Sequence, residues 1–385
     1  MNFEFTTVPR ILFGPGRMKE IRTIAPELGK RALVVCGSSV RAVERVQPLF
    51  SALTNAGVAY SAFATQGEPT IDEVRLGTKQ ARDEQCDLVI GFGGGSALDT
   101  GKAIAALLTN AGDPLDYIEV IGKGEPLAKP SAPYIAVPTT AGTGSEVTRN
   151  AVLGSPEHRV KVSLRSPHML PRVALVDPEL TYNLPADVTA ATGLDALTQL
   201  IEAFVSVKAN PMTDAICREG MHRVARSLRR AFELGDSPPW RENWQAIVTA
   251  REDMCVAGML SGMALANAAL GAAHGLSGPL GGIFEAPHGA LCAAVLPYVV
   301  EVNERAAKER LVGSPVIPRF EQIRRAMGDL GELVQALKIP SLRAYGVMRE
   351  NFPEIIEKAK ASNSMKGNPA VLEDDELREV LERAL

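Results

Sequence analysis

The chain has few cysteines, and their arrangement does not suggest a cross-linked fold. Five cysteines are spread over 385 residues and none belongs to a CxxC pair; they are Cys36, Cys86, Cys217, Cys255 and Cys292. Small domains that depend on disulfides carry an even, closely spaced set. The sequence therefore predicts no disulfide framework and a reducing, cytoplasmic compartment, with each cysteine serving as a small buried hydrophobe.

The chain also lacks the segments that send proteins to membranes or nucleic acids. Residues 1–10 show no basic stretch followed by an apolar one, as a secretory signal would. No charge-free run of about 18 apolar residues occurs, so we expect no membrane-spanning segment. A formal net charge of −4 gives no basic excess for binding a phosphate backbone. With 46% hydrophobic and 22% charged residues, what remains is an ordinary globular composition.

The first half of the chain alternates short apolar runs with amphipathic stretches. We predict strands at residues 31–36, 58–63, 87–92, 134–138 and 173–177. We predict helices between them at residues 40–56, 71–84 and 97–108. This alternation is typical of βαβ units and a Rossmann-like parallel sheet.

The pattern changes near residues 181–187, beyond which strand-like runs nearly vanish. Helical periodicity dominates over residues 188–205, 213–232, 244–273 and 289–305, and the last 70 residues read as short helices. Asp187 is the expected N-cap of the first of these helices. Because a single core rarely grows past about 250–300 residues, we predict an α/β domain over residues 1–180 and an all-α domain over residues 181–385.

Two glycine-bearing loops follow predicted strands and are candidate phosphate-binding segments. The strand at 87–92 runs into Gly93-Gly94-Gly95-Ser96 directly before a helix, where N–H groups and the helix dipole attract anions. A glycine-rich turn without a ligand is the alternative, since this is not a GxGxxG motif. Residues 138–146 add four hydroxyls and two glycines after another strand. Since parallel sheets bind ligands at the carboxyl ends of their strands, the two loops together predict a nucleotide site.

Two of the five histidines belong to a candidate metal site. His274 and His288 flank a glycine-rich connection, and Asp195 and Gln199 share one face of a predicted helix. Two histidines and a carboxylate are suited to zinc or ferrous iron. Ordinary core or surface histidines are the alternative, because the sequence alone does not bring these residues together.

Four segments resemble, in order, the motifs of the iron-containing (group III) alcohol dehydrogenase family. They are residues 93–102 (GGGSALDTGK), 138–146 (PTTAGTGSE), 193–197 (GLDAL) and 287–289 (PHG), and residues 13–16 (FGPG) also fit. The resemblance implies a dinucleotide-binding α/β domain and a helical metal and substrate domain, with the active site in a cleft between them. It further implies hydride transfer between NAD(P) and a small alcohol, aldehyde or ketone, and a homodimer.

The resemblance also assigns residues to the two halves of the active site. It places the pyrophosphate at Gly94, Gly95 and Ser96, and the rest of the cofactor site at Asp99, Thr139, Thr140, Ser145 and Lys161. It places Fe²⁺ or Zn²⁺ at Asp195, Gln199, His274 and His288. Asp195, His274 and His288 are the residues it implies for catalysis through this metal.

The chain departs from the family pattern at two positions. Gln199 stands where the family usually has histidine, and its neutral carbonyl oxygen is a weaker donor than imidazole. A weaker metal site, a different ion or a metal-independent, maleylacetate reductase-like carbonyl reductase are the resulting alternatives. Gly278 stands four residues after His274, where many members carry another histidine near the nicotinamide. Proton relay must then fall to water, the nicotinamide ribose or another group.

The end of the strand at 31–36 bears on cofactor choice. An acidic residue at the position of Gly37 would bind the ribose 2′-hydroxyl and repel a 2′-phosphate. Here Gly37 is followed by Ser38 and Ser39, with Arg41 close by. The sequence therefore predicts that NADP(H) is accepted and favoured. A sugar-phosphate cyclase related to dehydroquinate synthase, or a non-catalytic nucleotide-binding protein, are further alternatives.

Overall fold

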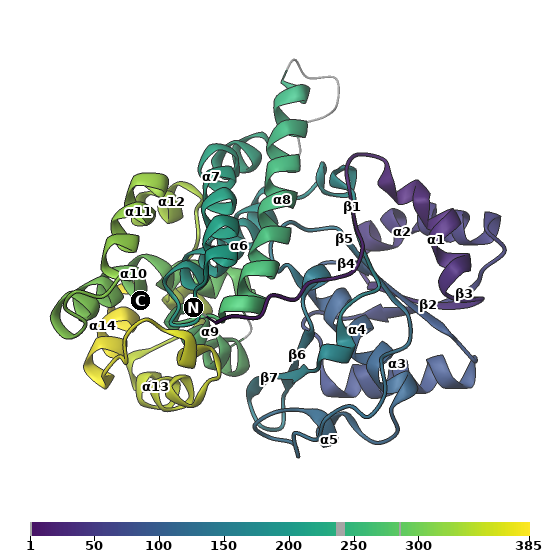
Figure 1. Ribbon diagram of the computed structural model, residues 1–385, viewed down its shortest axis with the longest axis horizontal. Coiled ribbons are helices and arrows are strands. Elements are labelled where there is room, and N and C mark those ends of the chain that lie inside the picture. Colours follow the sequence, from purple (N-terminus) through teal and green to yellow (C-terminus); the bar gives the residue numbers. More distant parts are fainter. Residues whose placement is uncertain (1, 236–242, 285) are drawn as a thin grey trace. The chain divides into compact units, whose positions relative to one another are not determined.

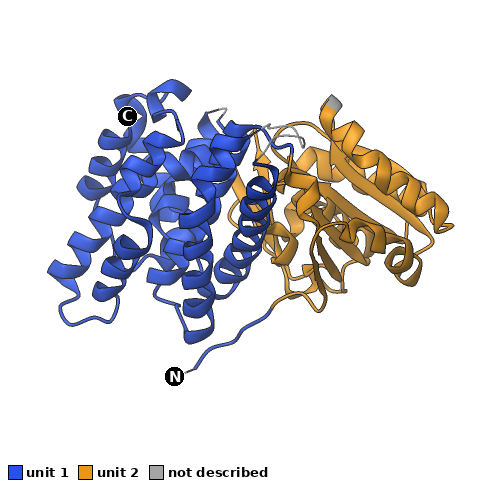
Figure 2. Ribbon diagram, turned by 90° about the horizontal axis from the view of Figure 1, so that it is seen from above, with its two compact units in different colours: residues 1–6, 141–143, 183–385 blue, residues 7–140, 144–182 orange. Residues whose placement is uncertain are grey.

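The computed structural model describes residues 2–235, 243–284 and 286–385. The chain forms two compact units (Figure 2): an α/β unit of residues 7–140 and 144–182, and a helical unit of residues 1–6, 141–143 and 183–385. The chain passes from the first unit to the second after residue 182, close to the boundary at 180 that the change of pattern indicates. The membership of residues 141–143 in the helical unit was not expected from the sequence.

A six-stranded sheet with the order β1-β8-β5-β4-β2-β3 forms the centre of the α/β unit (Figure 1). All neighbouring strands in it are parallel, which confirms the predicted fold class. The strands are β1 (Ile11–Phe13), β2 (Arg31–Gly37), β3 (Ala59–Thr65), β4 (Leu88–Gly93), β5 (Tyr134–Pro138) and β8 (Val173–Val176). The helices of this unit are α1 (Ile21–Leu28), α2 (Val40–Asn55), α3 (Ile71–Asp83), α4 (Gly95–Thr109) and α5 (Pro114–Tyr117).

Both faces of this sheet are buried, as the alternation along β2 shows. Leu33 and Val35 pack with residues of α3 and α4, whereas Ala32 and Val34 belong to the cluster that includes α1 and α2. All four side chains are fully buried. Parallel sheets are typically covered on both faces in this way, which holds the carboxyl ends of the central strands in fixed positions.

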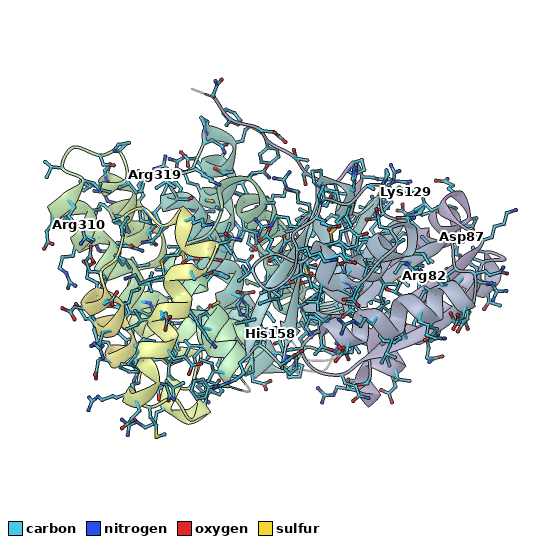
Figure 3. The ribbon with its side chains drawn as sticks, turned by 90° about the horizontal axis from the view of Figure 1, so that it is seen from below. Arg82, Asp87, Lys129, His158, Arg310 and Arg319 are labelled. Carbon is cyan, nitrogen blue, oxygen red and sulfur yellow. The ribbon has the colours of Figure 1, made fainter. Side chains whose placement is uncertain are left out.

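A two-stranded antiparallel hairpin was not predicted from the sequence. It consists of β6 (Asn150–Ser155) and β7 (Val160–Arg165). His158 lies in its turn, where Nδ1 is 2.8 Å from Oγ of Ser155 (Figure 3). The hairpin matters for the candidate site because it also carries Lys161.

The described residues of the helical unit contain helices and no β-strand, as predicted. The helices are α6 (Ala186–Val205), α7 (Pro211–Leu234), α8 (Trp244–Ala268), α9 (Ala272–Ile283), α10 (His288–Arg310), α11 (Ile317–Met327), α12 (Leu330–Ala336), α13 (Phe352–Ala361) and α14 (Asp374–Ala384). Arg319 on α11 forms an ion pair with Asp214 of α7 and lies over the ring of Phe204 of α6, with its guanidinium carbon 4.9 Å from the ring centre (Figure 3).

Two predicted helix boundaries are wrong. The single helix expected over residues 244–273 breaks after α8, because Ala269 adopts a left-handed φ of 64° and ends it. The axes of α8 and α9 differ by 102°. Asp187 is not an N-cap, since α6 already begins at Ala186; it lies instead in the first turn, where a carboxylate still complements the helix dipole.

The requirements for a membrane-spanning helix are a length of about 20 residues and a mostly apolar composition. No single helix in the described part of the chain meets them. Only α8 and α9 taken together reach the required length and composition, and they are separated by the 102° bend.

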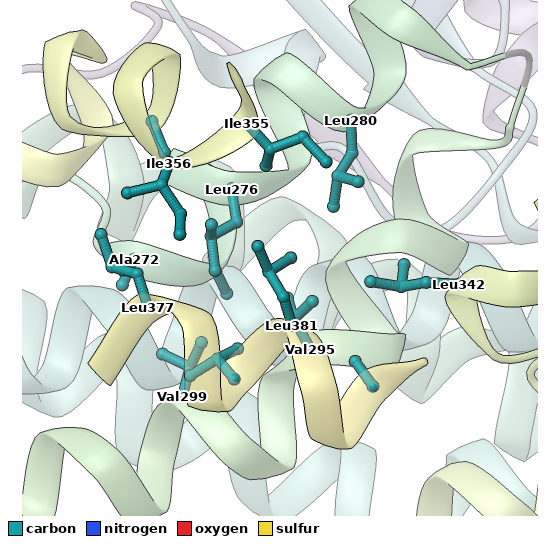
Figure 4. Close-up of a cluster of buried hydrophobic side chains, with 14 of the residues drawn as sticks. Ala272, Leu276, Leu280, Val295, Val299, Leu342, Ile355, Ile356, Leu377 and Leu381 are labelled. Atoms are coloured by element: carbon teal, nitrogen blue, oxygen red, sulfur yellow. The ribbon is translucent and has the colours of Figure 1, made fainter. Parts of the chain in front are cut away.

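A buried apolar cluster joins α9 and α10 to α13 and α14 (Figure 4). It includes Leu276 on α9, Val295 on α10, Ile355 on α13 and Leu381 on α14, all fully buried. Burying one such side chain contributes about 1.5–3 kcal/mol relative to leaving it exposed. This core fixes the relative positions of the two helices that carry His274 and His288.

Candidate active site

The predicted cofactor-binding segments lie at one edge of the parallel sheet. In the strand registers Gly93 of β4 pairs with Pro138 of β5, and Cys36 of β2 pairs with Phe92 of β4. The chain therefore leaves three neighbouring strands at the same edge, in residues 37–39, 94–96 and 139–140. The backbone N–H of Thr139 donates to the carbonyl of Gly93 at 2.8 Å and ties two of these segments together.

The N-terminus of α4 is open to a ligand. Gly94 is its N-cap residue and no side chain caps the helix. A Cβ on Gly94 would lie 3.4 Å from Thr140, in the space beside the helix end. Uncapped N–H groups at a helix N-terminus bind phosphate groups. Pyrophosphate binding by Gly94, Gly95 and Ser96 at this helix end stays a prediction.

A buried polar network braces this edge of the sheet from within the α/β unit. Ser145 Oγ donates to Asp99 Oδ1 at 2.5 Å, and the backbone N–H of Val152 on β6 donates to Asp99 Oδ2 at 2.9 Å. Lys102 Nζ donates to Ser145 Oγ at 2.9 Å and to the Ser145 carbonyl at 2.7 Å. Asp99 and Ser145 therefore have a positioning role, and their direct contact with a cofactor stays a prediction.

Burial shifts the pKa values of the charged groups in this network. It raises the pKa of Asp99 and lowers the pKa of Lys102. Lys102 Nζ nevertheless has four oxygen acceptors around it, which include Thr148 Oγ1 and the Asn150 carbonyl, and these acceptors favour its ammonium form. Burial also raises the pKa of Glu146 to about 7.

The other predicted cofactor residues of this unit lie at two places. Gly37 ends β2, and Ser39 caps α2 with its Oγ, which accepts from the backbone N–H of Ala42 at 3.2 Å. Ser38 is exposed beside it. Lys161 lies on β7, largely buried, with Nζ 3.2 Å from a carboxylate oxygen of Glu68. The role of Lys161 toward a cofactor stays a prediction.

The helical unit brings Asp195, His274 and His288 together, and it adds Cys292. One donor atom from each of these four side chains lies within 4.8 Å of all the others. They come from α6, α9 and the first turns of α10. The sequence analysis missed Cys292; its signal was the spacing of four residues from His288, which places both on one helix face.

A close contact between α6 and α10 builds this cluster. A Cβ on Gly289 would lie 2.3 Å from the carbonyl oxygen of Ala191 and 3.1 Å from Cβ of Asp195. Only glycine therefore allows the first turn of α10 to approach α6 so closely. This contact explains the glycine that follows His288 in the sequence.

Gln199 lies next to this cluster, and both ends of its side-chain amide already contact other side chains. Gln199 Nε2 donates to Asp195 Oδ2 at 3.1 Å, and Gln199 Oε1 lies 2.7 Å from Ser261 Oγ of α8. The single hydroxyl proton of Ser261 is shared between Gln199 Oε1 and the Gly258 carbonyl, which also lies at 2.7 Å. Because a carboxylate only accepts, the nitrogen must face Asp195 and the oxygen must face Ser261. Gln199 thus orients Asp195, and metal ligation by its carbonyl stays a prediction.

Glu202 supports His274 and was also missed in the sequence. It lies seven residues after Asp195 on the same face of α6. One carboxylate oxygen is 2.6 Å from His274 Nδ1, and the other accepts from the backbone N–H of Ala273 at the start of α9. In the neutral imidazole this contact keeps the proton on Nδ1 and leaves Nε2 available as a ligand atom.

The charges of the cluster stabilise one another. Burial opposes the ionised forms, but His274 and His288 outweigh it and lower the pKa of Asp195. Burial also opposes the imidazolium of His274, yet Cys292, Glu202 and Asp195 raise the pKa of His274. The same two histidines overcome burial to lower the pKa of Cys292 to about 7. These shifts favour the ionised forms of Asp195 and Cys292 and the imidazolium of His274, because opposite charges lie close together.

This donor set fits a divalent cation. Asp195 Oδ1 and His274 Nε2 are buried, face each other at 3.4 Å, and have no hydrogen-bond partner within the described part of the chain. Buried polar groups are rarely left this way without a reason such as a missing ion. A carboxylate and two imidazoles are normal ligands of zinc and ferrous iron.

Comparisons with known proteins identify the family of the chain. Residues 9–178 match the family described as "Iron-containing alcohol dehydrogenase", and residues 189–385 match "Fe-containing alcohol dehydrogenase family, C-terminal". The chain is 36% identical over 391 residues to 1,3-propanediol dehydrogenase of Klebsiella pneumoniae, covering 98% of this chain and 97% of that one. It is 34% identical over 387 residues to alcohol dehydrogenase 4 of Saccharomyces cerevisiae strain YJM789, covering 99% and 98%.

A solved structure shows the same fold over the whole chain. The crystal structure of a 1,3-propanediol oxidoreductase superimposes with a TM-score of 0.88 at 34% identity and covers 100% of both chains. Together with the order of the glycine loop, the hydroxyl loop and the Asp/His cluster, these matches confirm the resemblance drawn from the motifs. The chain belongs to the iron-containing alcohol dehydrogenase family and is an oxidoreductase of that family.

Proposed function

We propose that the protein transfers a hydride reversibly between NAD(P) and a small alcohol, aldehyde or ketone, with a divalent metal held in the helical unit. The observation that carries the proposal is that one donor atom from each of Asp195, His274 and His288 lies within 4.8 Å of the others. When bound, the nicotinamide supplies or accepts the hydride and the metal polarises the substrate oxygen as a Lewis acid. The chain itself binds and orients both groups.

The chain's own residues have separate tasks in this reaction. The N-terminus of α4, from Gly94 to Ser96, binds the pyrophosphate through backbone N–H groups. Asp195, His274 and His288 hold the metal, and Glu202 keeps the ligand atom of His274 available. Residue 278 is glycine and has no side chain that could supply a proton. Proton transfer would therefore pass through water or the cofactor ribose.

The substrate class follows from the relatives and is part of the proposal. Proteins named 1,3-propanediol dehydrogenase and alcohol dehydrogenase 4 match almost the whole chain. Short-chain primary alcohols, diols and their aldehydes are therefore the compounds to assay first. Rates over a panel that varies chain length and a second hydroxyl group will define the preference.

The start of α2 supports use of NADP(H). Ser38 is exposed, Ser39 lies at the helix N-cap, and Arg41 is exposed in the first turn. These groups suit a 2′-phosphate, and no carboxylate lies in residues 37–39 to repel it. We expect kcat/KM with NADPH to equal or exceed that with NADH. A value about tenfold higher for NADH would overturn this part of the proposal.

A metal-independent carbonyl reductase is the second candidate function. The observation that favours it is the engagement of Gln199 by Asp195 and Ser261 at the position of a family ligand. In that case His274 and His288 would bind the substrate or donate a proton.

One experiment separates the two candidates. Metal content is measured on protein purified without chelator, and NADPH-dependent aldehyde reduction is followed before and after EDTA treatment. Near-stoichiometric iron or zinc, with activity lost in EDTA and restored by metal, supports the Lewis-acid function. Activity that persists in metal-free protein establishes the metal-independent reductase instead.

We also propose a homodimer in a reducing, cytoplasmic environment. All five cysteines are buried and no disulfide joins them, which suits such a compartment. Light scattering coupled to size exclusion will give the oligomeric state, and a monomer at assay concentration would contradict the dimer.

A further inference from the structure

Asp195, His274, His288 and Cys292 together form what we call the metal-type cluster. Its fourth donor, Cys292, is not part of the family's Asp-His-His-His pattern. Cys292 is fully buried on α10, one turn after His288. Its sulfur belongs to the set of donor atoms that all lie within 4.8 Å of one another. The first two turns of one helix therefore present two donors, one imidazole and one thiol, to Asp195 and His274.

Two of the six donor–donor distances in this cluster match the edges of a metal tetrahedron, and all six are within 4.8 Å. Zinc holds oxygen and nitrogen ligands at about 2.1 Å and sulfur at about 2.3 Å, so a tetrahedron has O–N edges of about 3.4 Å and N–S edges of about 3.6 Å. Asp195 Oδ1 lies 3.4 Å from His274 Nε2. His288 Nε2 lies 3.6 Å from Cys292 Sγ. Two opposite edges of the cluster thus already have tetrahedral length.

The geometry of Gln199 makes it the weaker candidate for the fourth position. Only its carbonyl oxygen can ligate a metal, and that oxygen lies 2.7 Å from Ser261 Oγ. The amide nitrogen faces Asp195 instead. Gln199 is therefore oriented to support Asp195 from outside the set of donors.

Ser277 supports the sulfur in a comparable way. Its hydroxyl donates to the carbonyl of Ala273 at 2.7 Å, and its Oγ is 3.0 Å from Cys292 Sγ. Since the single hydroxyl proton is used by Ala273, a protonated Cys292 has two acceptors, Ser277 Oγ and His288 Nε2. Rotation of the same hydroxyl toward sulfur would stabilise a thiolate. Groups next to a ligand commonly orient it in this manner.

We propose that this chain binds its metal through Asp195, His274, His288 and the thiolate of Cys292, with Gln199 as a supporting residue. The inference rests on the metal-binding part of the proposed function and specifies its ligands. A thiolate is a soft donor that suits zinc, so the site favours zinc over ferrous iron.

The test uses cobalt as a spectroscopic probe in the full-length protein. Metal-free protein is titrated with Co²⁺ while the near-ultraviolet region is recorded, because a cobalt–thiolate bond produces an intense charge-transfer band that oxygen and nitrogen ligands do not. We expect the wild-type protein to bind one Co²⁺ with this band. Cys292→Ser should remove the band, and Gln199→Ala and Cys217→Ala should retain it; Cys217 is an equally buried cysteine on α7 and serves as the matched control.

The outcomes separate this inference from the proposed function. Stoichiometric Co²⁺ binding without a thiolate band, or an unchanged band in Cys292→Ser, would overturn ligation by Cys292 and leave the metal site intact. No Co²⁺ binding by the wild type would overturn both the metal site and its ligand set, whereas NADPH-dependent reduction would then still identify the metal-independent reductase.

Zinc affinity supplies a second readout that needs no spectroscopic band. Competition with a chromophoric chelator should show that Cys292→Ser weakens zinc binding at least about tenfold, since even loss of an outer-shell partner costs about 10–100-fold. Equal zinc affinities of wild type and Cys292→Ser, with the Cys217→Ala control also unchanged, would contradict the proposal.

Discussion

In the proposed function, the loop after β4 binds the nucleotide through backbone groups, whereas the cluster on α6, α9 and α10 binds the metal through side chains. The loop is continuous in sequence, and its function depends on glycines that leave the helix end accessible. The cluster joins residues up to 97 positions apart, from Asp195 to Cys292, and depends on the packing of separate helices. We therefore expect a substitution in the loop to change nucleotide binding. A substitution in the cluster should change metal binding and turnover.

The largest effect expected in the α/β unit is the loss of a buried charge. Lys102→Met removes an ammonium group that has four oxygen acceptors and leaves Asp99 without its cation. Breaking one side of a buried pair costs about 3–5 kcal/mol. Thermal unfolding should show a large loss of stability. Lys79→Met, which removes an exposed lysine paired with Asp83, should change the midpoint little; equal losses in both variants would contradict the bracing role.

The metal-type cluster should govern turnover. His274→Ala removes a ligand together with its contact to Glu202. Since the metal supplies several kcal/mol of transition-state stabilisation, turnover should fall about 10²–10³-fold. The dissociation constant of NADPH, measured by fluorescence titration, should remain nearly unchanged. The loop after β4 and the metal-type cluster are the two half-sites of this comparison. Comparable losses in turnover and in nucleotide binding would show that His274 does not act through the metal-type cluster alone.

A pH effect is expected from Glu146 in the hydroxyl loop. Its pKa of about 7 in the folded protein exceeds the ordinary value of 4.5, so the native state retains a proton that the unfolded chain releases. Stability should therefore decline as pH rises from about 4.5 to about 7, by about 3 kcal/mol in total. Glu146→Gln should be more stable relative to wild type at pH 8 than at pH 4 in thermal unfolding.

The control for this pH effect is Glu157→Gln, an exposed glutamate in the hairpin turn. Because this side chain is exposed in a turn, its replacement should change the unfolding midpoint little at either pH. A pH-independent difference for Glu146→Gln as well would show that Glu146 ionises normally.

The support behind His274 should matter less than the ligand itself. Glu202→Gln keeps a similar shape but removes the negative charge that holds the proton on His274 Nδ1. Loss of such an outer partner typically lowers metal affinity about 10–100-fold. Chelator competition will measure this change, and unfolding temperatures will show whether α9 remains capped. An unchanged metal affinity would reduce Glu202 to a structural cap.

The smallest effect expected is on the loop. Gly94→Val fills the space next to Thr140 at the N-terminus of α4. NADPH binding should weaken by about tenfold or more, corresponding to about 1.4 kcal/mol. Metal content, measured by elemental analysis, should equal that of the wild type. A loss of metal in this variant would show that the two half-sites are not independent.

The elements of the α/β unit that could be predicted from the sequence are those with a strong local pattern. Strand runs that are buried on both faces stand out as continuous apolar segments, and residues 134–138 coincide with β5. The loop after β4 was legible because its ligand atoms belong to consecutive backbone groups. The hairpin of β6 and β7 was missed although Val160, Val162 and Leu164 of β7 alternate with polar residues, a period that is typical of a half-buried strand.

The metal-type cluster could be predicted only in part, because its residues come from helices that are far apart in the sequence. Asp195, His274 and His288 were identified by resemblance, but Cys292 looked like any other buried cysteine. Glu202 was overlooked because its partner, His274, lies 72 residues away. Gln199 was assigned from its position, and its actual partners, Asp195 and Ser261, emerge only from the packing of α6 against α8.

The sequence by itself determined the class of the protein: a parallel α/β unit with a glycine loop for a nucleotide, followed by a helical unit with a candidate metal site. These features are local, since periodicity and turn residues act over a few neighbours along the chain. The tertiary structure decided which side chains meet, which amide is already occupied and which thiol joins the cluster. Those outcomes depend on close contacts such as that of Gly289 with Ala191, and contacts between distant segments are set by packing in three dimensions rather than by any local pattern.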